Sequence, residues 1–443
     1  MVKNLITKQS HAFYGTSAVE TRNHSTNGVI PKNHKSRINF LRKVCFALFA
    51  ATLFIVCTTA TMAQTEISFE EFEKQAEPIY INMVESFKQK DYQPSEKLCL
   101  EAVMLFNRLS KKNQKTYEQT QARQYYFLAR CLSLQNQKEK AIETFEKVIE
   151  YGWLDYARAK TDTDLDNIRS DERFVALMEI LREKSDYMYI LRNAGKYQRA
   201  DTTGLPRFTY EAATSYNLQE VKAYFKLDSI AGEGDEISKI INLMTWVHDN
   251  IGHHNSYALC EFTSIDIYNY SKTNGKGVNC RHLAITLNEM YLAMGFKSRY
   301  VTCAPTNESD TDCHVINSVY SNTLQKWLWI DPSVNAYVKD ENGNLLSIEE
   351  VRERLIDNRP LVLNEDAKWN NKTKQTKEEY LDTYMAKNLY WFQCPANSCF
   401  NAESRYRTIT ETYISLRPLN DERPAQYLEN EVITHDAAYF WEH

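Results

Sequence analysis

The apolar positions that follow Asn279 predict a buried helix. Large apolar side chains recur there at the spacing of one helical face, at Leu283, Leu287, Met290 and Met294. Asn279 is a favoured N-cap residue, and the glycine-containing stretch 275–278 before it predicts a loop. Gly295 ends the pattern. The helix is therefore expected to begin at Cys280, in whose first turn that thiol would lie.

Three extended segments are predicted after this helix, at residues 297–303, 313–320 and 325–330. The last two read as the arms of a hairpin around residues 321–324. If Tyr320 pairs with Gln325, then His314 and Asp331 lie directly opposite each other on neighbouring strands, with their side chains on one face. The same register puts three large apolar residues on that face, where they would enclose the polar pair: Ile316, Trp327 and Trp329.

The chain from Ser68 to about Lys184 is rich in Glu, Lys, Gln and Leu and predicts an all-helical domain. One stripe matches the positions of a tetratricopeptide helix pair, with Val148 where alanine is usual: Tyr125, Leu128, Ala129, Leu132, Ala141, Phe145 and Val148. Residues 79–102 resemble the pattern more loosely. Such a resemblance implies a peptide-docking groove and hence a protein partner, whereas the ordinary role of such a stripe is core packing.

A thiol, an imidazole and a carboxylate occur in order within the predicted elements, at Cys280, His314 and Asp331. A neutral cysteine is a weak nucleophile at neutral pH, so a site that uses one needs a base to take its proton. The base in turn needs a third group to fix its tautomer. A helix start also favours a thiolate. A lone cysteine or histidine is usually a packed or satisfied residue, but the three settings together favour catalysis.

These settings resemble the transglutaminase-like superfamily, a circular variation on the papain-like cysteine-enzyme core. The resemblance covers roughly residues 236–355, and its specific parts are Gly-Val-Asn-Cys-Arg-His-Leu at 277–283 and Lys-Trp-Leu-Trp-Ile-Asp-Pro at 326–332. It implies an α+β fold, in which a helix carrying Cys280 packs on an antiparallel sheet carrying His314 and Asp331. It also implies that these three residues are nucleophile, general base and orienting carboxylate.

The resemblance implies a thiol enzyme that acts on amide bonds of peptides or proteins through a cysteine thioester. Members of the superfamily include cross-linking enzymes, peptidases and amidases, and fold resemblance does not choose among them. The alternative is a binding or scaffolding protein of the cell envelope that kept the fold and lost the reaction. No cofactor is expected.

The second donor to an oxyanion is open at this stage, after the backbone N–H of Cys280. Asn274 stands six residues upstream, where papain-like enzymes place a glutamine. Transglutaminases proper use an upstream aromatic residue, which makes Trp246 or Tyr257 the rivals. An asparagine in a glycine-rich loop is ordinarily a turn former.

Composition and charge bear on location and partners. The chain has 443 residues and a net charge of −5. Its first 43 residues carry eight Lys or Arg and one Glu, which leaves −12 for the rest and argues against nucleic-acid binding. Arg42 and Lys43 precede the uncharged, mostly apolar stretch 44–63, which predicts an export signal cleaved after Ala63 or an uncleaved anchor. The body is expected outside the inner membrane, periplasmic or extracellular, and attached to it only through such an anchor.

Neither a metal site nor a full disulfide framework is predicted. His248, His253 and His254 fit no zinc spacing, and the acidic stretch 308–312 is expected to be a solvated loop. Seven cysteines remain outside the signal and Cys280, so at least one is unpaired. The two candidate bridges are Cys394–Cys399 and Cys303–Cys313.

These features divide the chain into five parts. After residues 1–63 come a helical domain at 64–190, a linker at 191–235, the catalytic-type domain at 236–360 and an extension at 361–443. Twelve aromatic residues follow position 379 in that extension. They are expected to cover the catalytic domain or to form a surface that stacks sugars or peptides.

Overall fold

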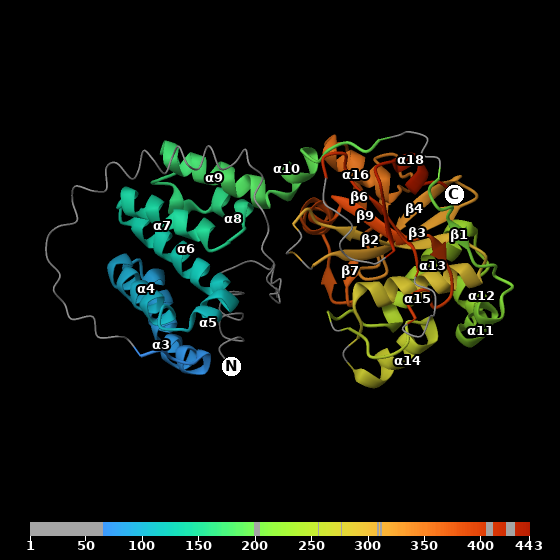
Figure 1. Ribbon diagram of the computed structural model, residues 1–443, viewed down its shortest axis with the longest axis horizontal. Coiled ribbons are helices and arrows are strands. Elements are labelled where there is room, and N and C mark those ends of the chain that lie inside the picture. The colour runs from blue at the N-terminus through green and yellow to red at the C-terminus, as the bar shows by residue number, and fades with distance from the viewer. Residues whose placement is uncertain are drawn as a thin grey trace. The chain divides into compact units, whose positions relative to one another are not determined.

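The computed structural model (Figure 1) describes residues 65–198, 204–255, 257–275, 277–307, 310, 312–404, 411–421 and 430–443. The chain divides into two compact units, with the division between Ser185 and Asp186. The predicted leader and export signal at residues 1–63 lie outside the described residues. Among the described residues, no helix is both long and apolar enough to cross a bilayer.

The first unit is all helical, as the sequence predicts. Polar side chains at Ser68, Ser110 and Asp155 accept backbone N–H bonds at three helix starts, which satisfies donors that every helix leaves unpaired. The elements are α3 (Phe69–Lys88), α4 (Tyr92–Phe106), α5 (Lys111–Thr116), α6 (Glu118–Leu134), α7 (Lys138–Glu150), α8 (Tyr156–Thr161), η1 (Thr163–Leu165) and α9 (Glu172–Ser185).

The apolar stripe predicted at 125–148 forms the contact between α6 and α7. All seven of its residues are buried in the core of this unit, so the helical spacing of the stripe is explained by packing. Arg130, also buried, points to acidic residues after α8, with Nε 3.2 Å from Asp162 and Nη2 2.5 Å from Asp164. The tetratricopeptide resemblance and its docking groove stay predictions.

The second unit is built around a six-stranded sheet in the order β12-β11-β9-β2-β3-β4. All neighbours are antiparallel except β11 and β12, which are parallel. The predicted α+β fold is thus confirmed. The strands are β2 (Ser298–Ala304), β3 (His314–Ser321), β4 (Lys326–Ile330), β9 (Trp391–Pro395), β11 (Tyr413–Leu416) and β12 (Glu431–Thr434). Three of these six strands come from residues beyond 360, so the sheet runs across the predicted boundary there.

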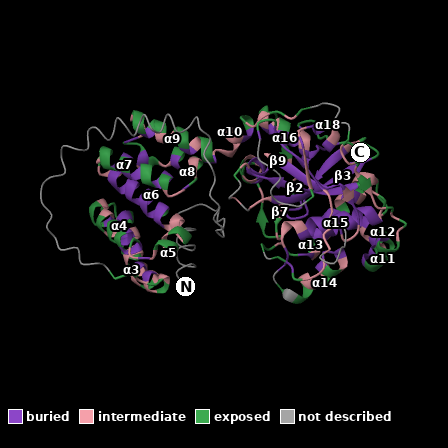
Figure 2. Ribbon diagram, in the orientation of Figure 1, coloured by how far each residue is buried: buried purple, intermediate pink, exposed green. Residues whose placement is uncertain are grey.

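Both faces of the sheet are covered, and its strands are buried almost throughout (Figure 2). One face packs on a layer of helices: α11 (Tyr216–Phe225), α12 (Leu227–Ala231), α13 (Glu236–Asn250), α14 (Ser264–Asn274) and α15 (Cys280–Ala293). The opposite face packs on α10 (Tyr187–Arg192), α16 (Ile348–Ile356), the π-helix η2 (Glu378–Met385), α17 (Ala386–Asn388) and α18 (Ala437–Phe440). Short pairs complete the unit: β1 (Thr209–Tyr210) with β10 (Asn397–Ser398), β5 (Val338–Lys339) with β6 (Val362–Leu363), and β7 (Lys368–Trp369) with β8 (Thr373–Lys374).

The hairpin between β3 and β4 has a register different from the predicted one. Tyr320 pairs with Trp327, not with Gln325. The turn is displaced because the carboxylate of Glu236 on α13 accepts a hydrogen bond from Thr323 N, at 2.8 Å, and from Ser321 Oγ, at 2.6 Å. A shift of two residues keeps every side chain on its face. Accordingly, the three apolar residues expected on one face share a single core cluster there.

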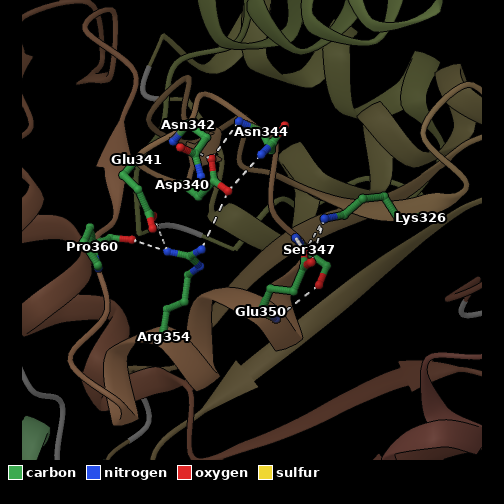
Figure 3. Close-up of polar contacts among 9 residues, drawn as sticks. All are labelled: Lys326, Asp340, Glu341, Asn342, Asn344, Ser347, Glu350, Arg354 and Pro360. Carbon is green, nitrogen blue, oxygen red and sulfur yellow. Dashed lines mark hydrogen bonds and ion pairs between the residues drawn. The ribbon is translucent and has the colours of Figure 1, made fainter.

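A polar network holds α16 next to β4 (Figure 3). Ser347 and Glu350 form a capping box at the start of the helix, which satisfies two backbone donors reciprocally. Lys326 of β4 lies 2.6 Å from the carboxylate of Glu350. Arg354 from the last turn reaches toward Asp340, which accepts backbone bonds inside the loop that follows β5. The helix is thereby fixed at both ends.

All eight cysteines in the described part of the chain are free thiols, so the two predicted bridges are wrong. The reason is the layering of the sheet. Cys394 belongs to the core on the α16 face, whereas Cys399 belongs to the core on the α15 face. Cys303 is also buried on the α16 face, while Cys313 is partly exposed in the segment before β3.

Candidate active site

Cys280 is the first residue of α15, as the sequence predicts, and it is partly exposed. Asn279 is the N-cap, and its side chain accepts a hydrogen bond from the backbone N–H of His282 at 3.2 Å. The thiol therefore lies where unpaired backbone N–H groups and the positive end of the helix favour a negative charge.

The segment before Cys280 is paired with the segment after α13. Val278 N donates to Gly252 O at 2.9 Å, and His254 N donates to Val278 O at 2.7 Å. The two segments approach so closely that a Cβ on Gly277 would collide with the carbonyl of Gly252, and the φ of Gly277 is +83°. Only glycine tolerates both the close approach and the positive φ. This pairing places His253 opposite Val278 and next to the thiol.

His314 and Asp331 are joined directly, in spite of the shifted register. His314 begins β3 and Asp331 follows β4, and Nε2 of the ring donates to Oδ2 of the carboxylate at 2.7 Å. Both side chains are buried. Asp331 also accepts hydrogen bonds from Ser333 N at 2.8 Å and from the hydroxyl of Tyr380 at 2.6 Å. The carboxylate is therefore fixed by three donors.

Because Asp331 binds Nε2 of His314, Nδ1 is the nitrogen left to face the thiol. Tyr384 lies on the same side, with its hydroxyl 3.4 Å from Nδ1 and its ring edge-to-face with the imidazole at 5.2 Å between centroids. Tyr380 and Tyr384 stand four residues apart on η2, so one π-helix supplies a contact to the carboxylate and one to the base. π-Helical turns are frequent at functional sites.

The charges at the site favour a thiolate–imidazolium pair. Burial disfavours the thiolate, but hydrogen bonds from His253 and His314 outweigh it and lower the pKa of Cys280 to about 6. Burial likewise disfavours the imidazolium, but the charge and hydrogen bond of Asp331 raise the pKa of His314 to about 10. The pKa of Asp331 is lowered, because His314 and Tyr380 outweigh the desolvation of its carboxylate.

His253 contributes a hydrogen bond that lowers the pKa of Cys280, and the sequence did not identify it as part of the site. In the sequence, His253 stands out only as one of three neighbouring histidines, whose spacing fits no zinc site. The indole N–H of Trp369 donates to Nδ1 of His253 at 2.7 Å, and Asn370 bonds both backbone groups of the histidine. These two partners follow it by more than a hundred positions, so no local pattern around His253 could have shown them.

His248 near the end of α13 and the two histidines that follow the helix, His253 and His254, have different surroundings. His248 is buried, and its Nδ1 lies 3.1 Å from the carbonyl of Pro332; desolvation lowers its pKa. His253 faces Cys280 and Trp369, whereas His254 is exposed. Within the described residues, no three His, Cys, Asp or Glu side chains converge as a metal site.

The acidic loop before β3 is not the solvated loop that the sequence predicts. Lys387, which is buried on α17, places its ammonium 3.0 Å from Asp310 and 2.9 Å from Asp312. Glu308 lies outside the described residues. A lysine from the C-terminal region thus supplies the cation for this loop, because two carboxylates beside a buried site need a positive partner.

The structure bears differently on the three oxyanion candidates. Trp246 on α13 packs against Phe225 and Tyr268, with ring centroids 5.4 and 5.6 Å away. Tyr257 is half exposed and lies edge-to-face with His282 of the first α15 turn, at 5.1 Å between centroids. Asn274 is the last residue of α14, and its side chain lies outside the described part of the structure. Their role as donors stays a prediction.

A second, partly buried network joins the first turn of α15 to the C-terminal region. Arg281 donates to Glu403 at 2.6 Å and to Thr302 of β2 at 2.9 Å. The hydroxyl of Tyr413 on β11 donates to the same carboxylate at 2.9 Å. Arg281, the residue after the thiol, is therefore bonded to the sheet, and moving it would break its ion pair with Glu403.

Comparison with known families agrees with this geometry. A family model described as the transglutaminase-like superfamily, for its core, matches residues 225–332. The match contains Cys280, His314 and Asp331 and ends before Trp369, Tyr380 and Lys387. Searches of curated proteins and of solved structures find no match for the chain. Residues 225–332 are thus similar to the core of the transglutaminase-like superfamily.

Proposed function

We propose that this protein is a thiol enzyme that acts on amide bonds of peptides or proteins through a thioester on Cys280. One observation carries the proposal: the ring of His314 donates from Nε2 to the carboxylate of Asp331 at 2.7 Å, and, against the effect of burial, hydrogen bonds from His253 and His314 lower the pKa of the Cys280 thiol to about 6. A merely buried cysteine has a raised pKa, as burial produces for Cys303 in the same unit.

The reaction would begin with attack of the Cys280 thiolate on the carbonyl carbon of the amide. A C–S bond forms, and the π electrons of the carbonyl move onto its oxygen. The imidazolium of His314 then gives its Nδ1 proton to the leaving nitrogen as the C–N bond breaks. Asp331 stabilises the imidazolium and keeps the ring in the tautomer with its proton on Nε2. Water or an amine, deprotonated by His314, resolves the thioester.

A peptide substrate is favoured by the exposed apolar side chains that flank the thiol. Tyr257, which contacts His282 of the first α15 turn, is 53% exposed, and Trp369, which bonds His253, is 41% exposed. Apolar residues gathered beside a reactive group provide contacts for side chains of an extended chain. Partner binding by the helical unit belongs to the same proposal, as does export through the apolar stretch 44–63.

The test combines a generic acyl donor with a thiol probe. p-Nitrophenyl acetate should release nitrophenolate in a burst of about one equivalent per Cys280, and a primary amine added to the assay should then compete with water for the thioester. Cys280→Ala should lose the burst, whereas Cys260→Ala, which removes another partly exposed thiol, should keep it. A burst that survives in Cys280→Ala would refute the assignment, and an absent burst in the wild type would favour the binding-protein alternative.

A further inference from the structure

The loop that follows α13 carries a second imidazole to the reactive thiol. It is held there from three sides: by backbone pairing of residues 252–254 with 277–278, by two backbone bonds to Asn370, and by the indole of Trp369. His253 is only partly exposed. The backbone bonds fix where the residue stands, and the indole bond fixes the orientation of its ring.

The partner of Nδ1 decides what this ring can do. An indole N–H donates and never accepts, so Nδ1 of His253 must accept from Trp369 and carries no proton. The ring proton then lies on Nε2, the nitrogen left to face Cys280. His314 has the opposite arrangement, because its Nε2 donates to Asp331 and its Nδ1 faces the thiol. The imidazole of His314 can therefore accept the thiol proton, whereas the imidazole of His253 can only donate a hydrogen bond toward the sulfur.

We propose that His253 is a catalytic hydrogen-bond donor, whose Nε2–H bonds the Cys280 sulfur at rest and the carbonyl oxygen of the tetrahedral intermediate during turnover. This rests on the proposed function of Cys280. As the C–S bond forms, negative charge moves from the sulfur to the oxygen, and the donor follows it together with the backbone N–H of Cys280. His253 transfers no proton. When the intermediate collapses, the carbonyl is restored and His314 protonates the leaving group.

The same contact accounts for the resting thiolate. The hydrogen bond from His253 contributes to the lowered pKa of Cys280, beside the contribution of His314. A donor that stabilises sulfur charge in the ground state and oxygen charge in the transition state differs from a general base, whose loss would remove proton transfer. Ground-state and transition-state effects can therefore be measured separately.

The experiment compares four variants with the full wild-type chain. His253→Ala removes the donor, His253→Gln keeps an N–H donor at a similar reach, Trp369→Phe frees Nδ1, and His254→Gln alters the exposed neighbour as the control. Two quantities are measured for each: kcat with p-nitrophenyl acetate, and the pH profile of Cys280 alkylation by iodoacetamide. Alkylation forms no oxyanion, so it reports the thiolate alone.

His253→Ala should lower kcat on the order of 10²-fold to 10³-fold, the usual cost of an oxyanion donor. Its alkylation should reach the wild-type plateau, with a midpoint moved to higher pH. His253→Gln should recover part of kcat, Trp369→Phe should lose less than His253→Ala, and His254→Gln should match the wild type. If the wild type is active and His253→Ala has the same kcat, this inference is wrong and the proposed function still stands. A wild type no faster than Cys280→Ala would refute the proposed function, and the inference with it.

Discussion

The second unit contains two regions that contribute differently to the site. Residues 225–332 match the transglutaminase-like core and contain Cys280, His314 and Asp331. Residues 361–443 lie beyond that match and supply three strands of the sheet together with the side chains that hold the reactive groups. Tyr380 bonds Asp331, and Trp369 bonds His253. The matched region thus contains the three residues of the candidate site, whereas the region beyond the match supplies hydrogen bonds that orient Asp331 and His253.

The largest effect is expected from the core region. Cys280→Ala should reduce turnover of p-nitrophenyl acetate to the uncatalysed background, because the thiol with the lowered pKa is the proposed nucleophile. The melting temperature should stay within a few degrees, since Cys280 is partly exposed and the loss of its sulfur leaves only a small cavity. Circular dichroism and kinetics on one preparation check this, and a large loss of stability would make the kinetic result uninterpretable as chemistry.

A smaller loss is expected for Asp331→Asn, which keeps the shape of the side chain and removes its charge. The pKa of His314 should fall, because the charge and hydrogen bond of Asp331 are the largest of the effects that raise it. We expect kcat to drop roughly 10-fold to 10³-fold, less than in a serine enzyme, because a thiolate–imidazolium pair is already favourable before substrate binds. Near-wild-type kcat per folded molecule would remove Asp331 from the site.

Tyr380→Phe tests the contribution of the C-terminal region directly. It deletes the hydroxyl that donates to Asp331 at 2.6 Å and leaves the buried ring in place. A hydrogen bond to a charged group contributes about 1.5–3 kcal/mol, so kcat should fall by about 10-fold and unfolding should require less denaturant. Tyr384→Phe deletes the neighbouring hydroxyl, which lies 3.4 Å from Nδ1 of His314, and tests the second contact of the same π-helix. Equal, negligible effects of both changes would show that the region merely covers the sheet.

Lys387→Met is expected to affect stability more than chemistry. The ammonium is buried between Asp310 and Asp312, and both carboxylates raise its pKa against the opposing effect of burial. A raised pKa of a lysine means that its contribution is fully present at neutral pH and is lost only when the pH rises through the folded-state value. Breaking such a pair costs about 3–5 kcal/mol. Denaturant unfolding at pH 7 measures the loss, with the exposed Lys372→Met as control.

Local patterns were sufficient for much of the fold and of the candidate site. The helix start at Cys280 followed from one N-cap and one apolar stripe, and the shared face of His314 and Asp331 followed from strand alternation, which a shift of two residues does not change. The register itself could not be predicted, because Glu236, which fixes the turn, precedes it by about 85 residues.

The errors share one physical cause, which is that the deciding partner is distant in sequence. The bridge between Cys394 and Cys399 looked feasible from spacing, but the two thiols enter cores on opposite faces of the sheet. The acidic loop looked solvated until Lys387 supplied its cation. The orientation of the His253 ring depends on Trp369, which lies 116 positions later in the chain. Tertiary partners of this kind leave no signal within a local window.

The pH dependence of Cys280 alkylation by iodoacetamide tests the central claim most directly, because it reports the thiolate without requiring a substrate. A lowered pKa means that the thiolate fraction rises as the pH passes upward through the folded-state value, which is about 6. The wild type should therefore alkylate rapidly with a midpoint near pH 6, and His314→Asn should move the midpoint upward. A wild-type midpoint at about pH 8.5, the ordinary value for a free thiol, would contradict the account.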